Sequence, residues 1–374
     1  MAFDATDVAL SVLKIAIVLL AILNVTPIMV WVERRGSALI QDRPGPNRVG
    51  PFGLFQSFAD ALKFILKEDI VPAAANKFLY TLAPAIGLLP ALTTIAVVPW
   101  GRPFTIHNVH LFGRTFFQQP RLFEPIVADL NIGILLVFAL ASLSVYGITT
   151  AGWSSNNKYS LFGGIRASAQ MISYELALTL AAVSALLAAG SLRLTEVVWR
   201  QTGYFVLFDT IKIPAWNIFS PAIWISAVVF IVSGFAETNR LPFDFAEAEA
   251  ELVAGYHTEY SSMKFALFFM SEYMAMTTMS ALIVTIFFGG WSIPWYVPPP
   301  TFLGFLLTAL VFVAKVAFML FVFVWIRWTI PRLKYDILMK IGWKVFLPLS
   351  LFWLVLTAGV LLAAGWLPGQ QGVP

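Results

Sequence analysis

Long apolar stretches recur along the chain, and polar segments between them carry most of the charge. Each stretch has about 20 residues or more, the length that an α-helix needs to cross a bilayer core. A β-barrel would instead show short segments of alternating hydrophobicity. The pattern predicts an all-α polytopic membrane protein in which residues 1–374 form one helical domain. Eight spans are predicted, at 8–32, 78–100, 124–147, 164–190, 219–238, 263–289, 302–327 and 341–366.

The first polar segment contains a different pattern. Its letters QDRPGPNRVG are rich in Pro and Gly and predict sharp turns. Apolar residues then recur at helical spacing from Phe52 to Ile65, while Asp60 and Lys63 occupy other faces. This predicts an amphipathic helix at the membrane surface. Such a helix serves either as an anchor at the lipid interface or as one wall of a cavity open to lipid, and the pattern leaves both open.

Composition agrees with the membrane class and limits the chemistry. Hydrophobic residues make up 59% of the chain and charged residues only 12%, about half the share of a soluble domain. The chain has no cysteine, which excludes disulfides and thiolate-bound iron–sulfur clusters in this protein. Its three histidines include His107 and His110 in a polar loop with no obvious third ligand, so we expect no metal site. The first apolar run is long enough to span, and we expect a retained helix rather than a signal peptide.

The distribution of Lys and Arg predicts an orientation. The first, third, fifth and seventh loops hold most of these residues, and the other loops hold fewer. Basic residues concentrate in cytoplasmic loops. We therefore expect the odd-numbered loops in the cytoplasm and both termini on the opposite side of the membrane.

Acidic residues gather in the fifth loop and at the start of the next span. The window from Glu237 to Glu272 holds seven of the chain's twenty acids but only two bases. On a helix, Glu247 and Glu251 share a face, and Asp244 precedes them by three residues. Repulsion and burial would both raise the pKa of these carboxyl groups. The alternatives are a solvated face or pairing with bases of a partner protein. The seven acids are Glu237, Asp244, Glu247, Glu249, Glu251, Glu259 and Glu272.

Ionisable residues also lie inside predicted spans. Glu175 lies in the letters AQMISYELALTL, Glu272 lies beside Tyr273, and Lys315 lies in FVAKVAFML. Such residues are expensive in hydrocarbon, so they usually face a wet cavity or a partner. A structural Lys–Glu pair is one interpretation, and a proton or ion path is the other.

Four segments resemble a known family. They are VERRGSALIQDRPGPNRVGPFGLFQSFADALKFILKED, GWSSNNKYSLFGGIRASAQMISYE, ETNRLPFDFAEAEAELVAGYHTEYSSMKFALFFMSEY and VWIRWTIPRLKYDILMKIGWK. These segments are similar to loops of one membrane subunit of respiratory complex I, NADH-quinone oxidoreductase. This component is called the H subunit in bacteria and subunit 1 in mitochondria. The resemblance covers nearly the whole chain.

The resemblance implies eight main helices and a place where the peripheral and membrane arms of complex I meet. There such a protein contributes to a chamber for ubiquinone or menaquinone, which is a substrate, while the redox centres belong to neighbouring subunits. The expected partners are the quinone-site and iron–sulfur subunits of the peripheral arm, the membrane-arm subunits and membrane lipids, and nucleic acid is not expected. The expected location is an energy-transducing membrane, and specifically the inner membrane of a bacterium.

The resemblance also implies two groups of site residues. The quinone-side group is Arg34, Arg43, Asp60 and Phe269, although Phe269 could equally be helix packing. The proton-coupling group is Glu175, Glu237, Asp244, Glu247, Glu249, Glu251, Glu272 and Tyr273, with Lys315, Arg327 and Arg332 as expected basic partners. As a hypothesis, quinone reduction creates charge that changes the protonation and packing of the fifth loop. Replacement of Glu247 or Glu251 by Gln is then expected to slow coupled turnover.

Other interpretations remain. A homologous subunit of a membrane-bound hydrogenase would share the acidic loop without necessarily using quinone. An independent proton-coupled transporter would often show an internal repeat, which this chain lacks. A purely structural scaffold leaves the carboxyl groups inside spans unexplained. The second loop and the stretch RQTGYFVLFDTIKIPAWNIF are longer than the family leads us to expect.

Overall fold

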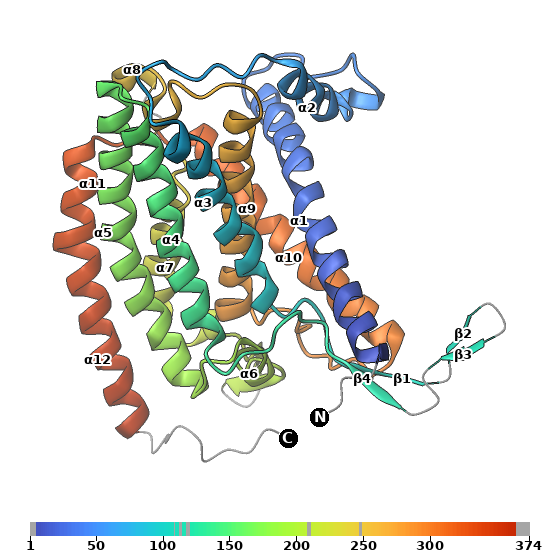
Figure 1. The fold of residues 1–374 in the computed structure, drawn as a ribbon. Coiled ribbons are helices and arrows are strands. Elements are labelled where there is room, and N and C mark those ends of the chain that lie inside the picture. Colours follow the sequence, from blue (N-terminus) through green and yellow to red (C-terminus); the bar gives the residue numbers. More distant parts are fainter. Residues whose placement is uncertain are drawn as a thin grey trace.

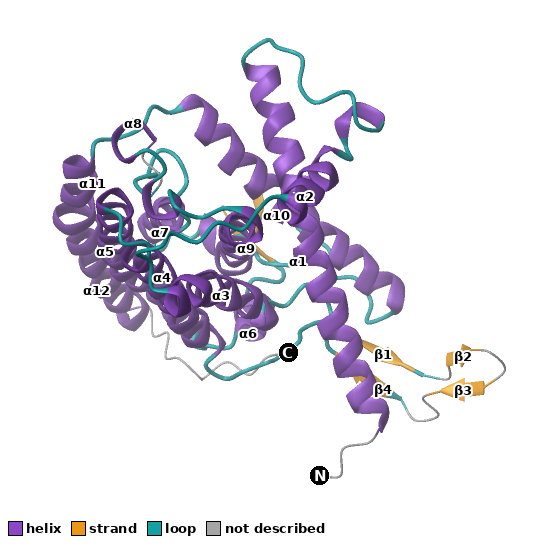
Figure 2. Ribbon diagram, turned by 45° about the horizontal axis from the view of Figure 1, so that its top comes forward, coloured by secondary structure: helices purple, strands orange, loops and turns teal. Residues whose placement is uncertain are grey.

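The computed structural model describes residues 5–107, 109–111, 114–116, 120–207, 211–246 and 249–363. Within these residues the fold is helical, with three short pairs of strands (Figures 1 and 2). The long helices are α1 (Ala5–Ile40), α3 (Lys77–Thr94), α4 (Gly133–Ser154), α5 (Lys158–Ala189), α9 (Ser262–Phe287) and α10 (Phe302–Thr329). The last span joins α11 (Tyr335–Ile341) to α12 (Leu347–Ala363) through a π-helical turn, Gly342–Phe346.

Seven helices among the described residues are long and apolar enough to cross a membrane, and they overlap seven of the eight predicted spans. The remaining prediction, residues 219–238, corresponds to the shorter helix α7 (Trp224–Glu237). At 1.5 Å per residue, its 14 residues extend only about 21 Å, less than the hydrocarbon core. Pro221 and the 3₁₀ turn at Asn217–Phe219 precede it, and most of its residues are buried by other helices.

The helix that follows the first span is confirmed. α2 (Gln56–Leu66) lies across the ends of α1 and α9 (Figure 1). Ser57 Oγ donates to the Pro27 carbonyl of α1 at 2.7 Å, and Ser262 Oγ of α9 donates to the Phe64 carbonyl at 2.9 Å. The apolar side chains of Leu62 and Leu66 are 60% and 84% exposed, so this face of α2 is not covered by the chain itself.

Small residues allow three helices to pack closely beside the candidate site. A Cβ atom on Gly147 of α4 would lie 2.7 Å from the backbone nitrogen of Gly87 in α3. A Cβ atom on Gly152 would lie 2.5 Å from the Ser160 carbonyl of α5. Both distances are too short for a side chain, so glycine sets the spacing of α3, α4 and α5. Small residues have the same role at many membrane helix interfaces.

The two ends of the helical bundle differ. α2 and the short helix α8 (Glu249–Leu252) lie at one end, and α6 (Leu194–Arg200) lies at the other, where α1 begins and α12 ends (Figure 1). The two loops that are longer than expected contain antiparallel strand pairs. β1 (Phe104–Ile106) pairs with β4 (Arg121–Phe123), β2 (Val109–Leu111) with β3 (Arg114–Phe116), and β5 (Tyr204–Leu207) with β6 (Ile211–Pro214).

Candidate functional site

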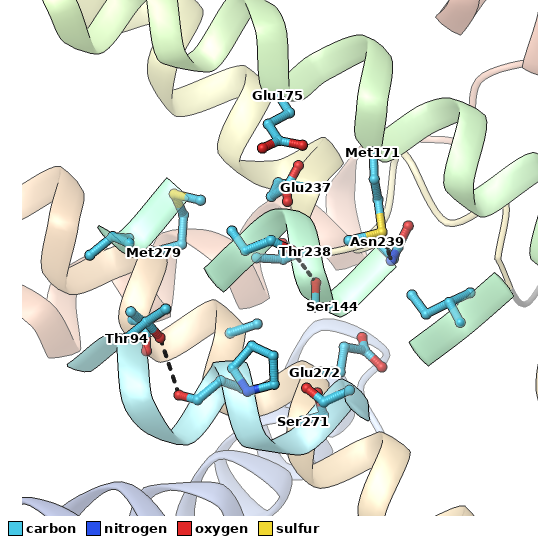
Figure 3. A pocket seen from close by; sticks show the side chains of 18 of the residues that line it. Thr94, Ser144, Met171, Glu175, Glu237, Thr238, Asn239, Ser271, Glu272 and Met279 are labelled. Atoms are coloured by element: carbon cyan, nitrogen blue, oxygen red, sulfur yellow. Dashed lines mark hydrogen bonds between the residues drawn. The ribbon is translucent and has the colours of Figure 1, made fainter. Parts of the chain in front are cut away.

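A cavity of about 100 Å³ lies between α3, α4, α5, α7 and α9. Its wall is mostly apolar, but three carboxyl groups from three different helices line it: Glu175, Glu237 and Glu272 (Figure 3). A single water molecule needs roughly 10–15 Å³ of such space, so the cavity has room for several. Hydroxyl groups of Thr238, Ser271 and other residues add polar atoms to the same wall.

Glu237 is the last residue of α7 and is 8% exposed. Both of its carboxyl oxygens are buried and have no hydrogen-bond partner among the described residues. Figure 3 shows its carboxyl group turned toward that of Glu175. A carboxylate at a helix C-terminus also meets the negative end of the helix dipole. An ionised carboxylate in this position is costly unless water in the cavity solvates it.

Glu175 is predicted correctly as an acid inside a span, and the structure places it on the cavity wall. It lies on α5 and is half-buried. The hydroxyl of Ser142 on α4 donates to its Oε1. No described base forms an ion pair with Glu175 or Glu237, so neither acid has a neutralising partner inside this part of the chain.

Glu272 connects the cavity to a buried network of charges. Arg240 Nε lies 2.8 Å from Glu272 Oε1, and Arg240 Nη1 lies 3.4 Å from Glu33 Oε1 and Oε2. Arg327 Nη1 donates to Glu33 Oε1, and the Tyr273 hydroxyl donates to Glu33 Oε2 at 2.6 Å. The network thus joins α1, the loop after α7, α9 and α10. Two acids and two bases balance each other within it.

Arg240 is the central cation of this network. Its side chain is 5% exposed, and its guanidinium lies over the Tyr273 ring at 4.3 Å. Burial lowers the pKa of Arg240, but the carboxylates of Glu272 and Glu33 more than offset this and raise it above its ordinary value. The guanidinium therefore stays charged.

Sequence reasoning missed Glu33 and Arg240. Glu33 stands before Arg34 and Arg35 and after the predicted end of the first span, so it resembled an ordinary loop charge. In the structure α1 continues to Ile40, which places Glu33 inside the helix, where it is 6% exposed. The signal for Glu33 in the sequence is a single acid directly after an apolar run, which is where a helix can continue beyond the predicted span. In the sequence, Arg240 is only one of the two bases in the acidic window.

The three expected basic partners, Lys315, Arg327 and Arg332, have different surroundings in the structure. Arg327 contacts Glu33, which is not among the predicted acids, so its pairing with those acids stays a prediction. The expectation for Lys315 is wrong, because its Nζ donates to the backbone carbonyls of Phe288, Gly290 and Ser292 at 2.8, 3.0 and 2.7 Å. These carbonyls follow the end of α9, which leaves carbonyl groups unsatisfied. Arg332 lies over the Phe245 ring at 4.9 Å, and its Nε and Nη2 have no hydrogen-bond partner among the described residues.

The fifth loop differs from the predicted helix of buried acids. Asp244 lies in a non-helical segment, near enough to Glu272 to interact with it electrostatically. The side chain of Glu251 is 52% exposed and pairs with Arg166 at 2.7 Å, so this carboxyl group is not buried. Glu249 begins α8, but its side chain lies outside the described part, and so does Glu247 altogether. Another residue of this loop, Tyr256, lines the cavity.

The quinone-side candidates lie apart from the cavity wall. Arg34 of α1 pairs with Asp60 of α2 at 2.5 Å, and Arg43 Nη2 donates to Ser37 Oγ at 3.4 Å. Phe269 of α9 packs against Phe265 at 4.7 Å and against the His257 ring at 5.8 Å. None of the four lines the cavity between α3, α4, α5, α7 and α9. They form the edge of the chain where α1, α2 and α9 meet.

His257 is another residue that the sequence did not single out. It is 5% exposed, its Nδ1 has no hydrogen-bond partner among the described residues, and aromatic rings surround it. Burial lowers its pKa to about 4, so the imidazole is neutral near pH 7.

Comparisons with known proteins identify the family. The family model described as NADH dehydrogenase matches residues 13–358. The chain is 48% identical to the H subunit of the NADH-quinone oxidoreductase of Salinibacter ruber, over 92% of this chain and 94% of that protein. It is 45% identical to the first H subunit of Geobacter metallireducens, over 96% and 98%, and 46% identical to the H subunit of Ehrlichia ruminantium, over 95% and 91%. With this identity over nearly the full length, the chain belongs to the family of NADH-quinone oxidoreductase H subunits, the membrane subunits of respiratory complex I.

Proposed function

We propose that this subunit couples quinone reduction to proton translocation through the cavity lined by Glu175, Glu237 and Glu272. The observation that carries the proposal is Glu237, a buried carboxyl group without a hydrogen-bond partner among the described residues, on the wall of a space that can hold water. Carboxyl groups in such surroundings, joined by water, can bind and release protons with a small change in their environment.

The quinone substrate, ubiquinone or menaquinone, would approach at the edge formed by α1, α2 and α9. The exposed apolar face of α2 suits a lipid-soluble molecule, and the Arg34–Asp60 pair holds that helix against α1. Arg34, Asp60, Arg43 and Phe269 would form one wall of the chamber. The quinone-site and iron–sulfur subunits of the peripheral arm would complete the chamber and supply the electrons, and other membrane-arm subunits would continue the proton path.

The end of the bundle that carries α2 and α8 would face the cytoplasm of a bacterial inner membrane. The bias of Lys and Arg toward these loops supports this orientation, and both chain termini would then lie on the opposite side. Reduction of quinone at this end adds negative charge. The ion network at Glu33, Arg240 and Glu272 joins α1, beside the Arg34–Asp60 pair, to the cavity wall, and it would transmit that charge to the carboxyl groups.

The test uses the whole complex reconstituted in proteoliposomes, with Glu237→Gln compared with Thr278→Val. Thr278 lines the same cavity with a buried hydroxyl that has no partner among the described residues, so its replacement changes polarity but no titratable group. We expect Glu237→Gln to lose proton translocation per NADH oxidised, and Thr278→Val to keep it. Equal proton yields in both variants and the unaltered complex would contradict a coupling role for the cavity.

A further inference from the structure

The cavity between α3, α4, α5, α7 and α9 has two unlike halves. Both α5 and α9 begin at the end of the bundle that carries α2 and α8, so Glu175 and Glu272 come before the apolar lining residues of these helices (Figure 1). Farther along, the lining is apolar apart from Thr94 and Thr278. Figure 3 shows Met279 and Thr94 on the side of the cavity away from Glu272. The apolar half includes Ala91, Val137, Phe138, Leu178, Met279 and Leu282.

Two of the three carboxyl groups have no cationic partner among the described residues. Glu272 faces Arg240 at 2.8 Å, so its charge is balanced. Glu237 is 8% exposed, and both of its carboxyl oxygens lack a hydrogen-bond partner in the described part of the chain. It is turned toward Glu175, which accepts a hydrogen bond from Ser142 (Figure 3). Buried carboxyl groups without donors are costly, so this pair suits a ligand with several N–H groups.

We propose that this cavity is a binding site for small lipophilic amines, with the ammonium group between Glu237 and Glu175 and the apolar body in the other half. A primary ammonium has three N–H donors and no acceptor, which matches two carboxyl groups that lack donors. Ligand pockets commonly join an apolar wall to a few polar groups that fix orientation. An apolar cavity of roughly 150 Å³ holds benzene, with its six carbons. The cavity of about 100 Å³ therefore suits a body of roughly four carbons.

The charge on the ligand would form inside the cavity. An uncharged amine dissolves in the bilayer that surrounds the helices, whereas an ammonium ion does not. Protonated Glu237 would give its proton to the amine, so that its O–H bond breaks and an N–H bond forms on nitrogen. The product is a carboxylate–ammonium pair, and no other reactant is needed. A quaternary ammonium cannot follow this route, because it is permanently charged and has no N–H group.

Occupation of the site has a consequence for coupling. An ammonium ion held at Glu237 keeps that carboxyl group ionised, so the group no longer exchanges protons. An amine such as n-butylamine should therefore slow NADH:quinone turnover of the whole complex in nanodiscs, where there is no pH gradient for the amine to dissipate. This consequence rests on the proposed function, whereas the binding itself does not.

The test measures binding of n-butylamine to the whole complex in nanodiscs by saturation-transfer NMR, with empty nanodiscs as the blank for partition into lipid. Glu237→Gln removes the acid at nearly constant size, and Glu251→Gln removes an exposed acid outside the cavity. We expect saturable binding that weakens by about tenfold or more in Glu237→Gln, the effect of losing a hydrogen bond to a charged group. Glu251→Gln should bind as the unaltered complex does. n-Butanol and butyltrimethylammonium should bind the unaltered complex more weakly than n-butylamine, again by about tenfold or more.

Equal affinity for n-butylamine in Glu237→Gln and the unaltered complex, or a signal no larger than that of empty nanodiscs, would overturn the site. Should Glu237→Gln fail to assemble, the three ligands on the unaltered complex decide, and n-butanol binding as tightly as n-butylamine would overturn it. The proton yield of Glu237→Gln separates the two proposals. If the yield is lost but n-butylamine does not bind, only the amine site fails. If n-butylamine binds through Glu237 while the yield stays normal, the site stands and the proposed function fails.

Discussion

Tyr273 donates its hydroxyl hydrogen to Glu33 across 2.6 Å, and this bond joins α9 to α1 over 240 positions of sequence. Both side chains are less than a tenth exposed. The bond therefore lies inside the bundle. If the Tyr273 hydroxyl were removed, water could not readily replace it as the donor to Glu33. It ties the helix that carries Glu272 to the helix that carries Arg34.

Replacement of Tyr273 by Phe should weaken this junction. Loss of a hydrogen bond to a charged group costs about 1.5–3 kcal/mol, whereas the retained ring still lies against Arg240. We expect a lower thermal midpoint of the assembled complex and a slower coupled rate. Tyr296→Phe is the matched control, because Tyr296 is 52% exposed. Equal midpoints for the two variants would show that the bond adds nothing to stability.

Lys315 should behave as a structural residue. Its ammonium group satisfies three carbonyls beyond the end of α9 and lies over the Trp216 ring at 4.1 Å. Lys315→Met leaves these carbonyls without their donor, each at a cost of about 1–3 kcal/mol if no water replaces it. We expect less assembled complex in membranes but an unchanged proton yield per NADH in the complex that does assemble. Normal assembly with a reduced yield would return Lys315 to the proton path.

His257 should make the subunit less stable in acid. Its pKa is about 4 in the folded protein, below the ordinary value of 6.5, so the unfolded chain binds a proton more readily. The stabilising contribution is complete above pH 6.5 and is lost as the pH falls from 6.5 toward 4. A difference of this size amounts to about 3 kcal/mol at most.

We therefore expect His257→Gln to flatten the fall of the thermal midpoint between about pH 7 and pH 5, the range in which the unfolded chain takes up the proton. His107→Gln is the control, because His107 lies in an exposed loop. The measurement is the midpoint of the purified complex in a series of buffers. A His257→Gln complex whose midpoint falls as steeply as that of the unaltered complex would show that another group controls the acid sensitivity.

The Arg34–Asp60 pair should affect quinone access rather than proton yield. Partly exposed pairs contribute only about 0–1 kcal/mol, so Asp60→Asn should leave the complex assembled. If α2 is a wall of the quinone entry, its loosening raises the apparent KM for a short-chain quinone with little change in protons per NADH. If α2 is only a lipid anchor, the KM stays the same. Lys67→Gln, on the same surface but outside the pair, provides the comparison.

Seven of the eight spans and α2 could be predicted because the bilayer fixes the length and sidedness of apolar runs. Glu175 and Glu272 could be predicted because a carboxyl group inside an apolar helix is conspicuous. The pairing of Glu33 with Arg240 could not, since it joins residues 207 positions apart and no local pattern records it. The partners of Lys315 were predicted wrongly for a related reason: backbone carbonyls at a helix end leave no mark in the sequence.

Coupling through the cavity requires Glu237 to change its protonation when quinone is reduced. Infrared difference spectra of the whole complex, recorded between oxidised and reduced quinone, report carboxyl groups directly. We expect a carboxyl C=O signal that disappears in Glu237→Gln and persists in Glu251→Gln, where the side chain is exposed and paired with Arg166. A carboxyl signal identical in Glu237→Gln and the unaltered complex would contradict this requirement.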